Sequence, residues 1–169
     1  MPFRHIFLTG FMGSGKSTVG RLLAHRLCLP FIDLDVEIEK CTGRQIKDIF
    51  AQDGETVFRA LEMTELCRLS DASGAAVVAT GGGIVIAPEN RRIMRAIGLI
   101  INLKVDYVSV MKRLSGDNSR PLLQQKGEND VLAMMSARQD AYADADYVIE
   151  TVDMTPNQVV TNIVRWLSQ

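Results

Sequence analysis

A glycine-rich segment near the N-terminus, GFMGSGKS at residues 10–17, narrows the folds open to this chain. It fits the pattern G-x-x-x-x-G-K-[ST], whose glycines let backbone N–H groups turn toward phosphate oxygens. An apolar run suited to a strand precedes it at residues 5–9, and an amphipathic helical pattern follows over residues 16–28. Strand, glycine loop and helix in this order predict a nucleoside triphosphate site, because the helix N-terminus adds partial positive charge at the phosphates.

The same segment supplies the side chains that such a site needs. Lys16 is placed to reach the β- and γ-phosphates, and the Ser17 hydroxyl is placed to ligate Mg²⁺. The nucleotide-binding residues predicted from the loop are Gly13, Ser14, Gly15, Lys16, Ser17 and Thr18.

Apolar strand-like runs alternate with helical patterns along the rest of the chain. We expect strands at residues 5–9, 31–33, 75–80, 99–103 and 147–150. We expect helices at residues 16–28, 55–70, 88–96, 105–114, 130–143 and 156–167, with shorter helical pieces over 35–50. Continuous apolar strands suit a parallel sheet covered on both faces, so the pattern predicts one α/β domain over residues 1–169, a three-layer α/β/α sandwich. Ligands should bind at the carboxyl ends of its strands.

Composition excludes several classes of protein. The net charge is −1 and no basic run occurs, so we expect no nucleic-acid partner. No apolar stretch is long enough for a membrane span. The chain starts in a strand without a signal-peptide pattern, and Cys28, Cys41 and Cys67 lack disulfide or metal spacing. We therefore expect a cytoplasmic protein with reduced and partly buried thiols. No obvious interface motif argues against a monomer, which is the expected state.

Two acids follow the second predicted strand. A phosphate-loop enzyme needs an acid near Mg²⁺, and the nearest candidates are Asp33 and Asp35. Strand alternation should send both carboxylates to the same side, where one can hold a metal-bound water and the other can accept a hydroxyl proton. Alternatively, Asp35 caps a helix that starts near Val36.

Three consecutive glycines, Gly81, Gly82 and Gly83, follow the strand expected at residues 75–80. They allow a ligand to approach the backbone closely, and their N–H groups can bind oxygen atoms. The alternative is a tight strand-to-helix turn with no ligand.

Two arginines lie at helical positions that a bound anion would explain. Arg138 falls on the apolar stripe of the helix at 130–143, and an inward-facing guanidinium must meet an anion, a buried salt bridge or water at the end of its stem. Arg59 has Glu55 four residues before it and Glu62 three residues after it, so a local ion pair is an alternative to ligand binding. Together the two arginines would suit a substrate carboxylate.

A polar, glycine-containing segment at residues 115–130 interrupts the pattern. Stretches of this length in compact domains are usually functional lids or disordered loops, and we expect a mobile lid. Arg120 within it is placed to act on the transferring phosphate, or else is a solvated loop charge.

Taken together, these motifs resemble the shikimate kinase family over essentially the whole chain. The resemblance rests on GFMGSGKST at 10–18, DLD at 33–35, GETVFRALE at 54–62, GGG at 81–83, RPLL at 120–123 and ARxxxY at 137–142. It implies a small phosphate-loop kinase with a five-stranded parallel sheet. Such a kinase transfers the γ-phosphate of ATP to the 3-hydroxyl of shikimate, in chorismate and aromatic amino-acid biosynthesis.

The resemblance also implies roles for the site residues. Asp35 contacts the shikimate hydroxyls as the candidate base, and the carboxylate is held chiefly by Arg59, Arg138 and the backbone of Gly81, Gly82 and Gly83. Asp33 acts on Mg²⁺ through water, with Ser17 as direct ligand. Lys16 and Arg120 stabilise phosphate charge, and the residues of the adenine side are Arg113 and Pro156. Leu34 stands where the family often has Ser or Thr, and its side chain should point away from the site.

Two other functions remain open at this point. One is a kinase for another small polyol acid such as gluconate, which shares the phosphate loop but not the full set of motifs. The other is a nucleotide-sensing module without catalysis, although Asp35, Lys16 and Arg120 are all present.

Overall fold

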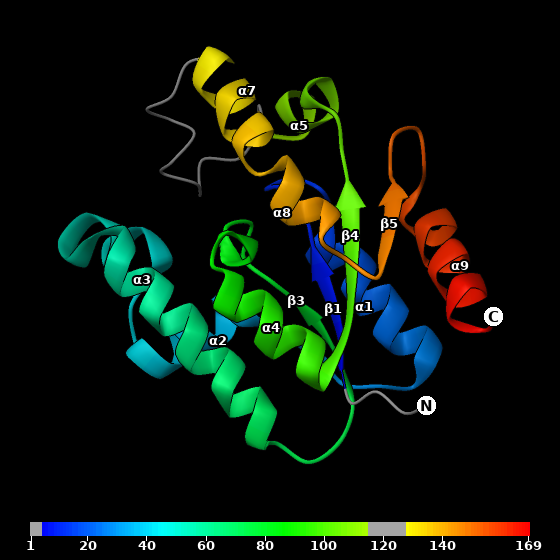
Figure 1. The fold of residues 1–169 in the computed structure, drawn as a ribbon, viewed down its shortest axis with the longest axis horizontal. Helices are drawn as coiled ribbons and strands as arrows, with labels where there is room; N and C mark the ends of the chain where they lie inside the picture. The colour runs from blue at the N-terminus through cyan, green and yellow to red at the C-terminus, as the bar shows by residue number, and fades with distance from the viewer. Residues whose placement is uncertain (1–4, 115–127) are drawn as a thin grey trace.

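A five-stranded sheet forms the centre of the protein (Figure 1). The computed structural model describes residues 5–114 and 128–169. The strand order is β2-β3-β1-β4-β5, and every neighbouring pair is parallel. The strands are β1 (His5–Thr9), β2 (Phe31–Asp33), β3 (Ala76–Ala79), β4 (Gly98–Lys104) and β5 (Tyr147–Glu150). The predicted parallel sheet is confirmed, and the predicted strand limits agree to within a residue.

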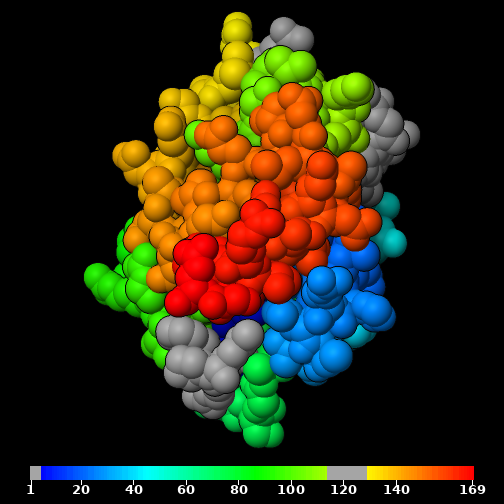
Figure 2. All heavy atoms as spheres, turned by 90° about the vertical axis from the view of Figure 1, so that its right-hand side faces the viewer, coloured from blue at the N-terminus to red at the C-terminus, as the bar shows by residue number. Residues whose placement is uncertain are grey.

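Helices cover both faces of this sheet (Figure 1). α1 (Lys16–Leu27) and α9 (Pro156–Leu167) pack side by side on one face, and Figure 2 shows them adjacent at the surface in blue and red. The opposite face carries α3 (Ile46–Asp71), α4 (Pro88–Ile97) and α8 (Gln139–Ala143). The remaining elements are α2 (Leu34–Thr42), the short 3₁₀ helix η1 (Ile84–Ile86), α5 (Tyr107–Leu114) and α7 (Glu128–Ala137).

The alternating side chains of the strands explain these layers. Ile6 and Leu8 of β1 point into the core under α1 and α9, whereas Phe7 between them points into the core on the other face. All five residues of β1 are buried, and its three central residues, Ile6, Phe7 and Leu8, are apolar, as suits a strand covered on both faces. The sheet therefore has a hydrophobic core on each side, as the continuous apolar strands predicted.

The strand register brings the chemistry-bearing loops to one edge. Ala79 of β3 is paired with both Leu8 of β1 and Asp33 of β2, so these three strands end level with one another. The phosphate loop follows β1, the triple glycine follows β3 and the first acid ends β2. Parallel pairing thus places three segments that are far apart in sequence at the carboxyl edge of the sheet.

Two helical regions contain breaks. Gly54, with φ +81° and ψ 176°, interrupts α3, so a helix does begin at the predicted Glu55. The single helix expected at residues 130–143 is wrong, because Arg138, with φ −101° and ψ −2°, separates α7 from α8. Its apolar stripe is nevertheless correct, since Val131 and Tyr142 are both buried in the core.

Two expectations drawn from composition have different outcomes. The thiols of Cys28, Cys41 and Cys67 are free, but all three residues are exposed rather than partly buried. Within the part of the chain that the structure describes, no helix is long and apolar enough to cross a membrane.

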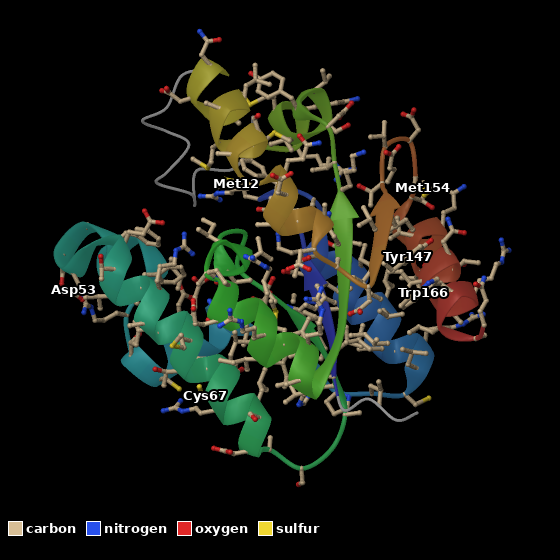
Figure 3. All side chains as sticks on the ribbon, viewed as in Figure 1. Met12, Asp53, Cys67, Tyr147, Met154 and Trp166 are labelled. Atoms are coloured by element: carbon tan, nitrogen blue, oxygen red, sulfur yellow. The ribbon has the colours of Figure 1, made fainter. Side chains whose placement is uncertain are left out.

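The C-terminal helix is anchored by an aromatic pair. Figure 3 shows Tyr147 of β5 beside Trp166 of α9, and their rings stack with centroids 4.8 Å apart and planes 5° apart. The helix starts at a capping box, in which the Thr155 hydroxyl accepts from the Gln158 N–H while the Gln158 side chain accepts from the Thr155 N–H. The stacked rings hold the end of α9 beside the start of β5, and the capping box satisfies backbone N–H groups at the start of the helix.

Substitution in β4 tests the two-sided core. Ile101 is fully buried in this central strand, so Ile101→Ala should lower the free energy of unfolding by about 2–5 kcal/mol. Val148→Ala in the edge strand is the control, because that side chain is 39% exposed and should cost less than about 1 kcal/mol. Urea unfolding of both variants measures the difference, and equal losses would contradict the assigned burial.

Candidate active site

The phosphate loop joins β1 to α1 and wraps around its own lysine. Lys16 Nζ donates to the carbonyl oxygens of Gly10 at 2.8 Å and Phe11 at 2.9 Å. Gly15, with φ +92°, precedes the first turn of α1 and lets the chain turn into the helix. A buried ammonium at a helix N-terminus makes this loop a strongly positive site suited to phosphate.

Ser17 and Asp33 meet beside the loop. The Ser17 hydroxyl donates to Asp33 Oδ2 at 2.6 Å, which joins the first turn of α1 to the end of β2. Oxygen ligands of this kind suit Mg²⁺, which usually takes one or two protein side chains and completes its shell with water and phosphate. Within residues 5–114 and 128–169 no group of three or more His, Cys, Asp or Glu residues could hold a metal ion by itself.

The two acids of the DLD motif face different parts of the site. β2 ends at Asp33 and α2 begins at Leu34, so the strand alternation expected to carry Asp35 to the same side does not apply. Helical geometry instead directs Asp35 into a second pocket while Leu34 is buried in the core, pointing away from the site as predicted. Asp35 does not cap α2, because the residue before the helix is Asp33, whose side chain makes no capping hydrogen bond.

One pocket of about 260 Å³ lies between the phosphate loop and the start of α9. Arg113 and Pro156, the residues expected on the adenine side, both line it. Arg113 also donates to the Gly13 carbonyl at 3.0 Å, which ties α5 to the phosphate loop. Its other lining residues are Ser14, Gly15, Thr18, Val19, Thr151, Met154 and Val159.

A second pocket, also about 260 Å³, lies on the other side of the loop and brings the remaining candidates together. We call it the acid pocket, because carboxyl groups from α2 and α3 line it. Its lining residues are Met12, Asp35, Val36, Glu39, Ile46, Phe50, Phe58, Arg59, Glu62, Gly81, Gly82, Gly83 and Arg138. Met12, labelled in Figure 3, belongs to the phosphate loop, so that loop contributes to the lining of both pockets.

Close packing explains the triple glycine. A Cβ atom on Gly81 would lie 2.5 Å from Glu62 Oε1 and 3.1 Å from Asp35 Oδ1. A Cβ on Gly83 would overlap the Arg59 guanidinium. Side chains at either position would displace the charged groups of the acid pocket, so a close approach, and not a turn alone, requires glycine here.

Arg59 is held by two glutamates. Its Nη1 donates to Glu62 Oε2 at 2.6 Å and its Nη2 donates to Glu55 Oε1 at 2.8 Å, so the local ion pairs considered from the sequence do form. Burial disfavours the charge, but the two carboxylates outweigh it and hold the pKa of Arg59 above its ordinary value. The guanidinium is therefore charged and oriented at the edge of the acid pocket.

Arg138 is placed differently. No carboxylate among the described residues lies within ion-pair distance of Arg138. The buried salt bridge considered from the sequence therefore does not form within these residues. Its guanidinium lies 6.0 Å from the centre of the Phe11 ring. The break between α7 and α8 brings Arg138 to the acid pocket, and Tyr142 one turn later donates its hydroxyl hydrogen to the Gly82 carbonyl.

Glu62 is the most enclosed charged group of the pocket. Its side chain has no exposed surface, and Oε1 accepts no hydrogen bond from the residues that the structure describes. Burial raises the pKa of Glu62 to about 7, although Arg59 opposes this rise; Asp35 and Glu55 add to it. This carboxyl group therefore changes its charge near neutral pH.

Comparisons with known proteins agree with this geometry. The family model described as "Shikimate kinase" matches residues 12–168. A shikimate kinase of Geobacter sulfurreducens is 47% identical over 167 residues, covering 98% of this chain and 92% of that protein. The chain belongs to the shikimate kinase family.

Solved structures of the shikimate kinase family have the same fold. One titled as shikimate kinase from Acinetobacter baumannii in complex with shikimate superposes with a TM-score of 0.92 at 35% identity, covering 98% of this chain and 93% of that one. A shikimate kinase from Bacteroides thetaiotaomicron gives 0.89 at 30% identity, covering 98% and 99%. A sugar kinase from Janibacter sp. HTCC2649, at 17% identity and a TM-score of 0.60, shows only the shared fold.

The sequence did not predict some features of this candidate site. Glu62 was expected as a local partner of Arg59, but the sequence does not show that it is fully buried against Gly81. The hydrogen bond from Tyr142 to Gly82 was not expected either, although the inward stripe on which Tyr142 lies was a signal. Arg120 and residues 115–127 of the expected lid lie outside the described residues.

Stability should depend on pH through Glu62. The folded protein holds this proton up to a pKa of about 7, against 4.5 for a free side chain, so between these values folded Glu62 binds more protons than unfolded Glu62. Wild-type stability should therefore fall, relative to Glu62→Gln, as pH rises from 4.5 to about 7, by up to about 3 kcal/mol.

Urea unfolding of both proteins across this range measures the effect. Gln keeps the shape and an acceptor for Arg59 but does not titrate. A constant difference between wild type and Glu62→Gln at every pH would contradict the assignment.

Proposed function

We propose that this chain uses ATP to phosphorylate the 3-hydroxyl of shikimate, giving shikimate 3-phosphate and ADP in chorismate and aromatic amino-acid biosynthesis. The observation that carries the proposal is the acid pocket, where two arginines, an aspartate and the triple glycine adjoin the phosphate loop. Membership of the shikimate kinase family and the likeness to a structure titled as a complex with shikimate support it.

The size and charge pattern of the acid pocket suit a small hydroxylated acid. Arg59 of α3 and Arg138, between α7 and α8, line the same cavity, so they can bind one carboxylate together. Gly81, Gly82 and Gly83 line the same cavity. Phe50 and Phe58 provide an apolar surface for the ring of the substrate.

Asp35 is the group that accepts the hydroxyl proton in this scheme. The 3-oxygen forms a bond to the γ-phosphorus, the bond from that phosphorus to the bridging oxygen of ADP breaks, and the proton passes to the Asp35 carboxylate. Asp35 is half-buried at the start of α2 and faces the cavity, as this role requires.

The phosphate loop and its neighbours hold the nucleotide. Gly13, Ser14, Gly15 and Thr18 surround the phosphates, and Lys16 neutralises charge on the β- and γ-phosphates. The adenine would occupy the pocket that Arg113 and Pro156 line. Arg120, outside the described residues, adds positive charge at the transferring group.

The hydrogen-bonded pair of Ser17 and Asp33 fits Mg²⁺. Ser17 would bind the ion directly, and Asp33 would bind one of its water molecules. When bound, Mg²⁺ neutralises phosphate charge and orients the nucleotide.

A panel of acceptors tests the proposed function. ADP release is measured with shikimate, with gluconate and with no acceptor, at equal ATP and Mg²⁺. We expect turnover with shikimate only. Turnover with gluconate would favour a kinase for another polyol acid, and ATP binding without turnover in any arm would favour a nucleotide-sensing module.

Replacing the proposed base separates the two halves of the site. Asp35→Asn should lower kcat by about 100-fold or more and weaken shikimate binding, because an amide keeps the shape but cannot take the proton. ATP affinity should hardly change, since Asp35 lines the acid pocket and not the nucleotide pocket. Loss of ATP binding in calorimetry would move Asp35 to the nucleotide side and overturn its role.

The carboxylate clamp predicts selective effects on KM. Arg138→Ala should raise the KM for shikimate by about 10- to 150-fold with little change for ATP, because one charged hydrogen bond in a sheltered site is lost. Arg138→Lys should rescue poorly, since an ammonium cannot form a guanidinium fork. Arg92→Ala, at an arginine that is 79% exposed on α4, is the control and should leave both values unchanged.

An amide analogue of shikimate shows whether Arg138 meets the carboxylate itself. Wild type should bind the neutral analogue much more weakly than shikimate, and Arg138→Ala should discriminate much less. If the mutant discriminated as strongly as wild type, Arg138 would not be the partner of the carboxylate.

A further inference from the structure

The acid pocket contains more negative than positive charge when its groups are ionised. Three carboxyl groups line it, from Asp35, Glu39 and Glu62, against the two guanidinium groups of Arg59 and Arg138. These charges give a net of −1, and Glu55 adds a further carboxylate behind Arg59. A substrate carboxylate must therefore enter a cavity whose own charge opposes it.

Glu62 is the carboxyl group that most directly competes with such a substrate. Its Oε2 occupies Nη1 of Arg59 at 2.6 Å, and Glu55 occupies Nη2, so both terminal nitrogens of this arginine already face carboxylates. An incoming carboxylate at Arg59 would lie close to Glu62. Because Glu62 is fully buried, solvent does little to screen that repulsion.

The other groups near Glu62 do not favour its ionised form. Asp35 of α2 lies across Gly81, with its Oδ1 and Glu62 Oε1 both within 3.1 Å of the place a Cβ would take. Tyr142 of α8 interacts with Glu62 and is uncharged at neutral pH, with its pKa raised chiefly by burial. The triple glycine contributes no charge, so Arg59 is the main group that favours ionised Glu62.

We propose that Glu62 is a positioning residue that takes up a proton when the substrate carboxylate binds Arg59, so that shikimate and a proton bind together. This inference rests on the proposed function. Protonation removes the excess negative charge of the cavity and releases part of the Arg59 guanidinium for the substrate. Glu62 keeps its place beside Arg59 in either state, because its side chain is fully buried and Gly81 packs against it.

The pKa of Glu62 allows this exchange at physiological pH. Since free enzyme has a value of about 7, Glu62 is partly or mostly ionised from neutral pH upward, and a nearby anion raises the value further. Proton uptake is therefore largest just above neutrality. In that range shikimate affinity should weaken by up to about tenfold for each unit of rising pH.

Calorimetry measures the linked proton directly. Shikimate is titrated into the enzyme without nucleotide, at about pH 7.5, in buffers of different ionisation enthalpy, and the slope of binding heat against that enthalpy gives the protons exchanged. We expect uptake of up to about one proton per shikimate in wild type and none in Glu62→Gln. Glu55→Gln is the matched control: it removes a carboxyl group from the same arginine, but one that is 56% exposed, and should keep the uptake.

A purely structural role for Glu62 gives a different result. Gln still accepts a hydrogen bond from Arg59, so loss of a brace alone would change affinity without abolishing a buffer-dependent heat. Proton uptake that persists in Glu62→Gln would overturn the proposal, as would wild-type binding without any uptake. No shikimate binding at all would overturn the proposed function together with this inference, whereas binding without uptake overturns the inference alone.

A second measurement uses wild-type protein, in case Glu62→Gln does not fold. With ¹³C-labelled glutamate, the titration midpoint of the Glu62 carboxyl signal should move to higher pH when shikimate is added. An unchanged midpoint in the presence of bound shikimate would overturn the proposal.

Discussion

Parallel pairing of β1 with β3 and of β3 with β2 is the constraint on which the site depends. It makes three strands end level, so that the phosphate loop, the triple glycine and Asp33 meet at one edge. Both faces of the sheet are covered by helices, so that edge is where the strand ends remain open to ligands. The phosphate loop follows β1, which lies between β3 and β4 in the sheet. The two pockets therefore lie on either side of that loop.

The sequence predicts the structure correctly where a local pattern allows only one conformation. The phosphate loop, the apolar strands and the helix starting at Glu55 were predicted because glycine spacing and apolar periodicity determine them locally. The expectation that Asp33 and Asp35 face the same side was wrong, because α2 begins at Leu34 and helical rotation replaces strand alternation. The break at Arg138 was missed because the apolar stripe continues across it without a glycine or proline to mark it.

The acid pocket required tertiary information. Nothing local distinguishes Arg59, paired with two neighbours on its own helix, from an ordinary surface arginine. The difference lies in Glu62, which is fully buried, with its Oε1 packed where a side chain at position 81 would stand. Burial of one partner turns a local pair of small energetic consequence into a charged group whose proton is sensitive to its surroundings.

A neutral side chain at position 62 would repel the substrate less than a glutamate does. The need to orient Arg59 explains why a glutamate stands there. Arg59 must stay oriented when no substrate holds it, and a long flexible side chain loses conformational entropy when it is ordered. The ion pair with Glu62 offsets this loss of entropy in the free enzyme, although burial of the carboxylate is itself unfavourable. A group whose pKa lies near neutral pH can supply the orienting charge before binding and give it up to a proton afterwards, so orientation and charge balance need not be satisfied in the same state.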